Sequence, residues 1–459
     1  MHRNVVKFGG SNLKCKSDLQ KIITAVKSYE NPPVIVVSAL YGITDKIIGI
    51  IKNIHQKETS VQDCVSEITV QYIEVLNENI GDINYRAKII SEIEKRAEKL
   101  TQFLQGIQCI EETPDFLSDR ILSYGERFSS VLLTGILNFN GLKSGEILPE
   151  EIPLFTDGEF GNASVDFEKS APGISNLFPP NTICVVPGFY GVSSEYKVTL
   201  FGRGGSDYSA AALARLLNAK TLDVWKDVDG FMSSDPRLIK TAQKIDKLTY
   251  KEAAELAYFG AAILHPRAVE PLIEAKIPIR IFNINKADEF NALTEINCHE
   301  NHHSDIIKSV TFSEDFGVLK LKGPGVGIKP GILAKVTTLL DEKNINIRSV
   351  ITSQIAINIL LSAKDLQKAF ETVSGMNLQA ISEIQQRDGI SVIATVGEGI
   401  LEKPGIAARI FSAVARKNIN IEMIAFGASQ VSAYFLLAKE DCFEAVSEIH
   451  DEFFTNPGL

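Results

Sequence analysis

The sequence predicts an α/β domain with a mainly parallel sheet flanked by helices, followed by two small α+β modules. Three observations support this prediction. Apolar strand-like runs alternate with helical patterns over residues 1–300, glycine-rich turns join strands to helices, and two sequence words near the C-terminus repeat at one common offset. Such alternation is typical of a parallel sheet with helices on its faces.

The strands of the first domain can be placed from their composition. Residues 34–37 and 183–186 are continuous apolar runs, which is typical of parallel strands buried on both faces. A helix is expected after the glycine-rich turn at 202–205, because apolar residues then recur at helical spacing. Further strands are predicted at 5–8, 198–201 and 221–225.

A helical insertion interrupts this α/β pattern. Residues 34–113 contain no proline, and Ile89, Ile93 and Leu100 recur at helical spacing within them. We therefore predict one domain over 1–300 with a helical insertion at about 44–135.

A duplicated module follows. The word Lys-Pro-Gly-Ile occurs at 329–332 and 403–406, and Lys-Asn-Ile-Asn-Ile occurs at 343–347 and 417–421, both with an offset of 74 residues. Two words in one register indicate duplication. Each copy is expected to form a strand, a Pro-Gly loop, a helix, and a strand beginning at Asn-Ile-Asn-Ile. The modules are placed at 308–385 and 389–459, after a polar, histidine-rich linker.

Composition excludes several classes of protein. The chain has 459 residues, with 47 Lys+Arg against 57 Asp+Glu and a net charge of −10, which argues against a nucleic-acid partner. No apolar run approaches the roughly 20 residues of a membrane-spanning helix. The six cysteines form no CxxC pair, and no signal-peptide core precedes the first strand. A cytoplasmic protein with reduced thiols is expected.

Two glycine-rich turns are candidates for anion binding. Residues 7–11, Lys-Phe-Gly-Gly-Ser, follow the first strand and combine a cation with exposed backbone amides. Residues 202–207, Gly-Arg-Gly-Gly-Ser-Asp, offer the planar guanidinium of Arg203. Either could be an ordinary strand-to-helix turn, with Ser206 and Asp207 as helix caps. Two such turns in one domain favour an anion site, whereas the absence of a P-loop motif excludes Walker-type nucleotide binding.

Three further segments carry weaker signals. The first is residues 123–127, Ser-Tyr-Gly-Glu-Arg. The second is the acidic loop at 225–230, which follows a buried strand, where ligands often bind in α/β proteins. Residues 299–303 match H-E-x-x-H formally, but their neighbours are polar, so we do not expect a zinc site there.

In combination, these segments resemble the signature segments of the aspartate kinase family, in the family's order. The tandem modules resemble its paired ferredoxin-like ACT domains, and the resemblance covers nearly the whole chain. The segments are residues 7–11, 38–39, 42–44, 123–126, 202–207, 225–230, 233–237 and 252–260.

The resemblance implies an amino-acid-kinase fold and an activity. Aspartate kinases transfer the γ-phosphoryl group of ATP, with Mg²⁺ on its phosphates, to the side-chain carboxylate of L-aspartate. The product, 4-phospho-L-aspartate, starts the pathway to lysine, threonine and methionine. No protein side chains are expected as metal ligands, and assembly into a homo-oligomer through the ACT domains is expected by analogy.

The resemblance also implies roles for individual residues. Lys7 and Asp207 would be catalytic, with Lys7 stabilising the transferred group and Asp207 orienting Lys7. The aspartate would be held by Arg203 at its α-carboxylate and by Glu126 at its ammonium, with Ser38 and Thr44 completing the pocket. The nucleotide would contact Lys7, Phe8, Gly9, Gly10, Lys226, Asp227, Met232 and Arg237.

Some positions depart from the family pattern. Many members have threonine at the position of Lys226, tyrosine at that of Met232, and lysine or glutamine at that of Ala262. In lysine-inhibited members, an aspartate that pairs with the effector amine stands where this chain has Arg348, whereas Ser353 matches. Feedback regulation is expected, but lysine, threonine, another effector or none all remain open.

Three alternative functions fit the sequence less well. Another amino-acid kinase, acting on glutamate or N-acetylglutamate, would not account for residues 123–126 or for two ACT domains. A catalytically dead amino-acid sensor would not need Lys7, Arg203 and Asp207. A fusion with homoserine dehydrogenase would show a G-x-G-x-x-G fingerprint, and the sequence has none.

Overall fold

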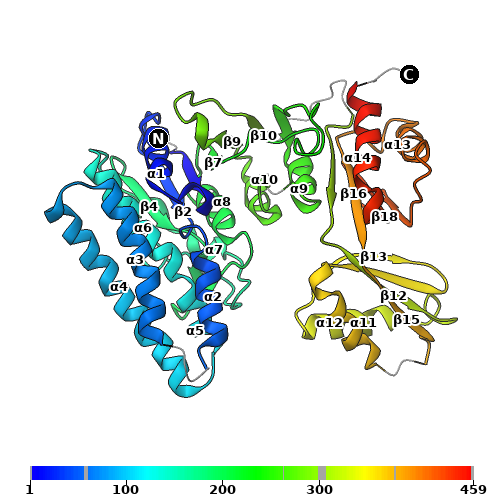
Figure 1. Ribbon diagram of the computed structural model, residues 1–459, viewed down its shortest axis with the longest axis horizontal. Helices are drawn as coiled ribbons and strands as arrows, with labels where there is room; N and C mark the ends of the chain where they lie inside the picture. Colours follow the sequence, from blue (N-terminus) through cyan, green and yellow to red (C-terminus); the bar gives the residue numbers. More distant parts are fainter. Residues whose placement is uncertain (1–2, 56–59, 262, 298–305, 377–378, 456–459) are drawn as a thin grey trace. The chain divides into compact units, whose positions relative to one another are not determined.

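The computed structural model describes residues 3–55, 60–261, 263–297, 306–376 and 379–455 (Figure 1). They form two compact units. The first unit consists of Met1–Phe231, Lys244–Ala254 and Ala262–His299, and the second of Met232–Gln243, Glu255–Ala261 and Glu300–Leu459.

An eight-stranded sheet forms the centre of the first unit. Its order is β3-β4-β2-β1-β7-β9-β10-β8, and only the β9–β10 pair is antiparallel among the described neighbours. The predicted mainly parallel sheet is therefore confirmed. The strands are β1 (Val5–Phe8), β2 (Val34–Val37), β3 (Ser144–Glu146), β4 (Ile183–Pro187), β7 (Leu222–Lys226), β8 (Lys247–Thr249), β9 (Ile279–Asn283) and β10 (Thr294–Asn297).

Helices flank this sheet, and a helical insertion is present as predicted. Within the insertion α3 and α4 lie side by side (Figure 1). Their buried faces carry apolar residues at helical spacing, including Tyr72 on α3 and Ile93 on α4. The helices are α1 (Lys16–Lys27), α2 (Ile43–Asn53), α3 (Val61–Asn79), α4 (Ile83–Ile110), α5 (Asp115–Leu122), α6 (Tyr124–Phe139), α7 (Phe167–Ser170), α8 (Gly205–Leu216), α9 (Tyr250–Tyr258) and α10 (Glu270–Ala275).

One predicted strand has a different partner from the others. Residues 198–200 form β6 (Val198–Leu200), which pairs antiparallel with β5 (Tyr190–Val192) in a separate two-stranded sheet. All three residues of β6 are buried, as are those of β1, β2 and β4 in the large sheet, so an apolar run alone does not reveal which sheet a strand joins.

The second unit contains two four-stranded antiparallel sheets, which agrees with the predicted α+β modules. The first has the order β13-β14-β12-β15 and carries helices α11 and α12, and the second has the order β11-β16-β18-β17 and carries α13 and α14. The strands are β11 (Ser309–Ser313), β12 (Gly317–Lys322), β13 (Ile347–Thr352), β14 (Ala356–Leu361), β15 (Glu383–Arg387), β16 (Ile390–Val396), β17 (Met423–Phe426) and β18 (Ser432–Ala438). The helices are α11 (Ile332–Glu342), α12 (Leu366–Ser374), α13 (Ile406–Ala415) and α14 (Cys442–His450).

The strands do not begin at the repeated Asn-Ile-Asn-Ile words. The expectation of a strand starting there was wrong, because the first asparagine of each word ends the helix turn with a positive φ, 53° at Asn344 and 56° at Asn418. Asparagine tolerates this left-handed conformation. The strands start three to five residues later, at Ile347 and Met423.

Chain order and module order differ in the second unit. Strand β11 lies at the start of the range predicted for the first module, yet it pairs with β16 of the second sheet. Segments 232–243 and 255–261 also belong to this unit. Ser233 Oγ lies 2.9 Å from His450 Nε2 on α14, and Ser432 Oγ donates a hydrogen bond to Glu255 at 2.7 Å. The domain ranges drawn from the sequence remain predictions.

Candidate active site

A cavity of about 780 Å³ lies in the first unit, where the parallel strands end. Lys7 comes from the end of β1, Ser38 follows β2, and Phe189 follows β4. The carboxyl ends of adjacent parallel strands are the usual ligand site of an open α/β sheet. The sequence-predicted residues that line the cavity are Lys7, Gly10, Ser38, Thr44, Glu126, Arg203 and Asp207.

Lys7 and Asp207 form a buried ion pair inside this cavity. The Lys7 ammonium contacts Asp207 in the first turn of α8, and Lys226 Nζ, at the end of β7, lies 3.6 Å from the other carboxylate oxygen. Burial would raise the pKa of Asp207, but Lys226 and Lys7 together hold it at about 2. Burial lowers the pKa of Lys7. Asp207 is therefore a fixed anion between two ammonium groups.

Glu126 is a buried carboxyl group in the first turn of α6. Its Oε1 lies 3.4 Å from Ser206 Oγ, and its Oε2 is buried without a hydrogen-bond partner among the described residues. Burial raises the pKa of Glu126 to about 8, against smaller opposing effects from the backbone of Ala39 and from Lys7. An unpartnered carboxyl oxygen in a cavity can accept a hydrogen bond from the ammonium group of a ligand.

Arg203 lies on the turn that precedes α8, and its side chain is exposed on the cavity. No ion-pair partner for it is present in the described part of the chain, so its guanidinium is available to an anionic ligand. Neighbouring side chains pack so closely on this turn that only glycine fits at residues 204 and 205. A Cβ on Gly204 would come within 2.2 Å of the His265 ring, and one on Gly205 within 2.7 Å of the Phe189 ring.

The remaining glycine-rich turn also needs its glycine. A Cβ on Gly10 would lie 2.9 Å from the Ala39 carbonyl oxygen. The buried Asn12 donates a hydrogen bond to the Trp225 carbonyl at 2.8 Å, and this contact joins the ends of β1 and β7. The Phe8 ring is fully buried and packs on Trp225, with ring centres 6.3 Å apart, so only the Phe8 backbone is available to a nucleotide.

The other predicted nucleotide residues lie in two places. Lys226 belongs to the ion cluster just described, and Asp227 is exposed directly after β7. Met232 and Arg237 belong to the second unit, where Arg237 forms a bidentate pair with Asp235. Ala262 and the H-E-x-x-H match at 299–303 lie outside the described residues.

The predicted effector residues lie in the first ACT-like module. Arg348 pairs with Asp315 at 2.6 Å and stacks 4.4 Å above the Phe316 ring. Asp315 also accepts hydrogen bonds from Ser362 Oγ and the Ala363 amide. Ser353 is exposed. The positive charge of Arg348 is thus already matched by an acidic group of the same module.

Several residues that support the site were not singled out from the sequence. Asp119 accepts hydrogen bonds from the amides of Gly161 and Leu200, both at 2.8 Å, and fixes two cavity loops. The Tyr72 hydroxyl donates to the Gly125 carbonyl at 2.8 Å and accepts from the Leu40 amide. The hydrogen-bond partners of both side chains are distant in sequence. Helical periodicity therefore indicates that Tyr72 is buried, but it reveals neither set of contacts.

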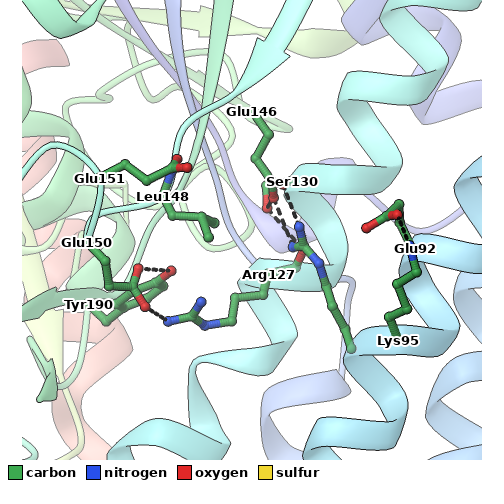
Figure 2. Close-up of polar contacts among 10 residues, drawn as sticks. Glu92, Lys95, Arg127, Ser130, Glu146, Leu148, Glu150, Glu151 and Tyr190 are labelled. Atoms are coloured by element: carbon green, nitrogen blue, oxygen red, sulfur yellow. Dashed lines mark hydrogen bonds and ion pairs between the residues drawn. The ribbon is translucent and has the colours of Figure 1, made fainter.

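A network of buried and half-buried charged groups anchors the helix that carries Glu126. Figure 2 shows Glu150 between Arg127 and Tyr190, and Ser130 beside Glu146. Arg127 is 6% exposed, and its guanidinium lies 4.5 Å from the centre of the Tyr190 ring. Arg127 directly follows Glu126 on α6, so the network fixes the position of the Glu126 carboxyl group.

Comparison with known proteins agrees with this architecture. The amino acid kinase family model matches residues 2–283, and two ACT-domain models match residues 311–374 and 393–453. The chain belongs to the amino acid kinase family.

Relatives that match nearly the whole chain include aspartokinases and bifunctional proteins with an aspartokinase part. Lysine-sensitive aspartokinase 3 of Escherichia coli is 27% identical over 98% of this chain and 99% of its own length. The bifunctional aspartokinase/homoserine dehydrogenase of Buchnera aphidicola is 29% identical over 98% of this chain, which spans 56% of that relative. The resemblance to aspartate kinases drawn from the motifs is therefore confirmed.

Solved structures give the same result. The crystal structure of E. coli aspartokinase III in complex with aspartate and ADP has a TM-score of 0.82 at 25% identity, covering 98% of this chain and all of that one. The aspartate kinase of Clostridium acetobutylicum has a TM-score of 0.74 at 27% identity, with 98% and 100% coverage. Within the described ranges, no helix is long and apolar enough to cross a membrane.

Proposed function

We propose that this protein transfers the γ-phosphoryl group of ATP to the side-chain carboxylate of L-aspartate. The observation that carries the proposal is the Lys7–Asp207 ion pair in one cavity with Glu126 and Arg203, with Lys226 on the other oxygen of Asp207. Two ammonium groups suit the transferred phosphoryl group, and a carboxyl group together with a guanidinium suits an amino acid. The E. coli relative with a TM-score of 0.82 was solved with aspartate and ADP.

The reaction needs charge compensation rather than a general base. A carboxylate is already nucleophilic at neutral pH, but it must approach an anionic phosphate. At 4 Å two unit charges repel by roughly 1 kcal/mol in water and about 4 kcal/mol at an effective dielectric of 20. Lys7 lies where it can offset this repulsion and stabilise the charge on the transferred group, as in other phosphoryl transfers. Asp207 holds Lys7 in place and keeps it protonated.

Aspartate is oriented by complementary charges. Arg203 takes the α-carboxylate, because its guanidinium has free donors on the cavity. Glu126 takes the ammonium group at its unpartnered oxygen, and Ser38 and Thr44 line the cavity close by. Held in this way, the side-chain carboxylate is directed towards Lys7.

In the proposal the nucleotide contacts residues of the first unit, which are Lys7, Phe8, Gly9, Gly10, Lys226 and Asp227. Met232 and Arg237, which belong to the second unit, stay predictions from the resemblance. Mg²⁺ would arrive on the ATP phosphates. Among the described residues, no group of three or more His, Cys, Asp or Glu side chains is placed to hold a metal ion. The triphosphate itself would therefore provide most of the ligands, together with water.

Regulation by an amino acid through the ACT modules is part of the same proposal, as is a homo-oligomer formed through them. The internal pairing of Arg348 with Asp315 supports an effector other than lysine at this position, because a second cation would face an arginine. Threonine remains a candidate effector.

The proposal is tested by ATP-dependent acyl-phosphate formation, trapped with hydroxylamine. Aspartate and glutamate are compared in parallel with Mg²⁺ present, each with and without lysine or threonine. Aspartyl hydroxamate without glutamyl hydroxamate is the expected result. Product from glutamate alone would identify a different amino-acid kinase, and no product from folded protein would favour a sensor.

A further inference from the structure

The backbone of Phe189 has an unusual conformation at the edge of the cavity. Its φ is +78°, in the left-handed region that bulky residues rarely adopt. Among the described non-glycine residues with positive φ, Phe189 is the one that lines the cavity. A strained conformation persists only where its surroundings fix it, and such positions gather at functional sites.

Hydrogen bonds fix the backbone of Phe189 at both its amide and its carbonyl group. Its amide donates a hydrogen bond to Ser209 Oγ at 2.9 Å, and its carbonyl accepts one from the Phe201 amide at 2.9 Å. Ser209 in turn donates to the Gly205 carbonyl at 2.9 Å. One buried hydroxyl on α8 therefore links Phe189 to the residue that begins this helix.

The ring of Phe189 packs directly on the start of α8. A Cβ at Gly205 would lie 2.7 Å from Phe189 Cδ2, and a Cβ at the preceding Gly188 would lie 2.9 Å from the Ser206 Cβ. Glycine at both positions lets the β4–β5 connection touch the helix start. The next two residues of the helix are Ser206, beside Glu126, and Asp207, the partner of Lys7.

We propose that Phe189 is a positioning residue: its strained backbone presses the ring onto Gly205 and thereby fixes Ser206 and Asp207 in register with Glu126 and Lys7. This inference rests on the proposed phosphoryl transfer for its activity readout. The simpler interpretation is that the ring only packs on the small β5–β6 sheet, to whose apolar cluster it is adjacent. That interpretation predicts loss of stability without a specific loss of catalysis.

The two interpretations are separated by Phe189→Gly. Glycine adopts positive φ without steric cost, so this variant removes the ring and relieves the backbone. Phe189→Asn is the second variant, because asparagine also tolerates the left-handed region. Tyr196→Gly is the matched control: Tyr196 is another aromatic residue with positive φ (58°), it is 56% exposed, and it does not line the cavity.

Steady-state kinetics, thermal unfolding and hydrogen exchange are measured on each full-length variant. We expect kcat/KM for aspartate to fall about a hundredfold in Phe189→Gly and Phe189→Asn, as displaced catalytic groups require. KM for ATP and the Tm should stay close to those of Tyr196→Gly. Hydrogen exchange at the amides of Tyr208 and Ser209 should become faster only in the Phe189 variants.

Each outcome decides the proposal. Unchanged kcat/KM in Phe189→Asn, or unchanged exchange at the start of α8, would overturn it. A loss of activity that is accompanied by a fall in Tm below that of Tyr196→Gly, in both Phe189 variants, would also overturn it. That result would support simple packing. If the wild type lacked aspartate kinase activity, the proposed function would fail, and the exchange measurement alone would still decide the role of Phe189.

Discussion

Replacing Glu126 by glutamine should stabilise the fold and weaken aspartate binding at the same time. The substitution keeps the shape of the side chain and removes its charge. Because burial raises the native pKa of Glu126 to about 8 from a reference value of 4.5, the native state binds more protons than the unfolded state between these two values. Stability contributed by this group is therefore complete below pH 4.5 and is lost as the pH rises towards 8.

The magnitude follows from this window. At pH 7 Glu126 is ionised in the unfolded chain and mostly protonated in the native state. This difference lowers the free energy of unfolding by about 3 kcal/mol, at 1.36 kcal/mol per pH unit. Glu126→Gln removes this cost, so its free energy of unfolding at pH 7 should exceed that of the wild type by up to about 3 kcal/mol. The gain is an upper bound, because the new amide group needs hydrogen-bond partners of its own.

Aspartate binding should change in the opposite direction. Loss of a charge-assisted hydrogen bond to the substrate ammonium is worth about 1.5–3 kcal/mol, or roughly a 10- to 100-fold increase in KM for aspartate. In the wild type, the ionised fraction of Glu126 rises from about a tenth at pH 7 to a half at pH 8, so KM for aspartate should fall about fivefold. In Glu126→Gln this fall should disappear.

The assays are urea unfolding at several pH values and steady-state kinetics with aspartate varied at saturating ATP. KM for ATP is the internal control, since Glu126 does not face the nucleotide in the proposal. A Glu126→Gln variant that is less stable at pH 7 and binds aspartate normally would refute the reasoning on both counts.

Three further predictions concern other charged groups. Lys7→Ala should lower kcat by roughly a thousandfold with an unchanged circular-dichroism spectrum, and near-normal turnover would exclude Lys7 from the mechanism. Arg203→Ala should raise KM for aspartate about tenfold or more with no change in Tm, because its side chain is exposed; a normal KM would place the α-carboxylate elsewhere. Arg348→Ala frees the Asp315 carboxylate, so lysine should inhibit this variant at concentrations at least about tenfold below any that affect the wild type, and a variant as insensitive to lysine as the wild type would exclude this pair from effector binding.

Much of the architecture could be predicted because it depends on local patterns. Buried parallel strands appear as apolar runs, and the duplicated words alone reveal the two modules. The glycine-rich turns placed Lys7, Arg203 and Asp207 at strand ends, and the cavity brings these three together.

Long-range pairing could not be predicted in the same way. Strand β11 pairs with β16, more than 75 residues away in sequence, across the intervening module. Segment 232–243 packs with the second module through Ser233 and His450. Neither contact produces a periodic pattern in the sequence, because the first depends on the pairing of two strand edges and the second on a single hydrogen bond.

The protonation state of Glu126 also could not be predicted from the sequence. Glu126 could be assigned to the substrate ammonium by resemblance, but its raised pKa results from burial among α6, the loop after β2 and Ser206. The close packing of Phe189 on Gly205 and of His265 on Gly204 is revealed only by three-dimensional distances. A positive φ at a phenylalanine cannot be deduced from its neighbours in sequence.

The most direct test of the central claim follows one oxygen atom. Aspartate labelled with ¹⁸O in its side-chain carboxylate is incubated with the protein, ATP and Mg²⁺, and the product is cleaved with hydroxylamine. Hydroxylamine attacks the acyl carbon, so the released phosphate keeps the oxygen that joined carbon to phosphorus. The account predicts phosphate carrying one ¹⁸O atom, formed roughly a thousandfold more slowly by Lys7→Ala. Unlabelled phosphate from the wild type would show that water, and not aspartate, attacks ATP, and would contradict the account.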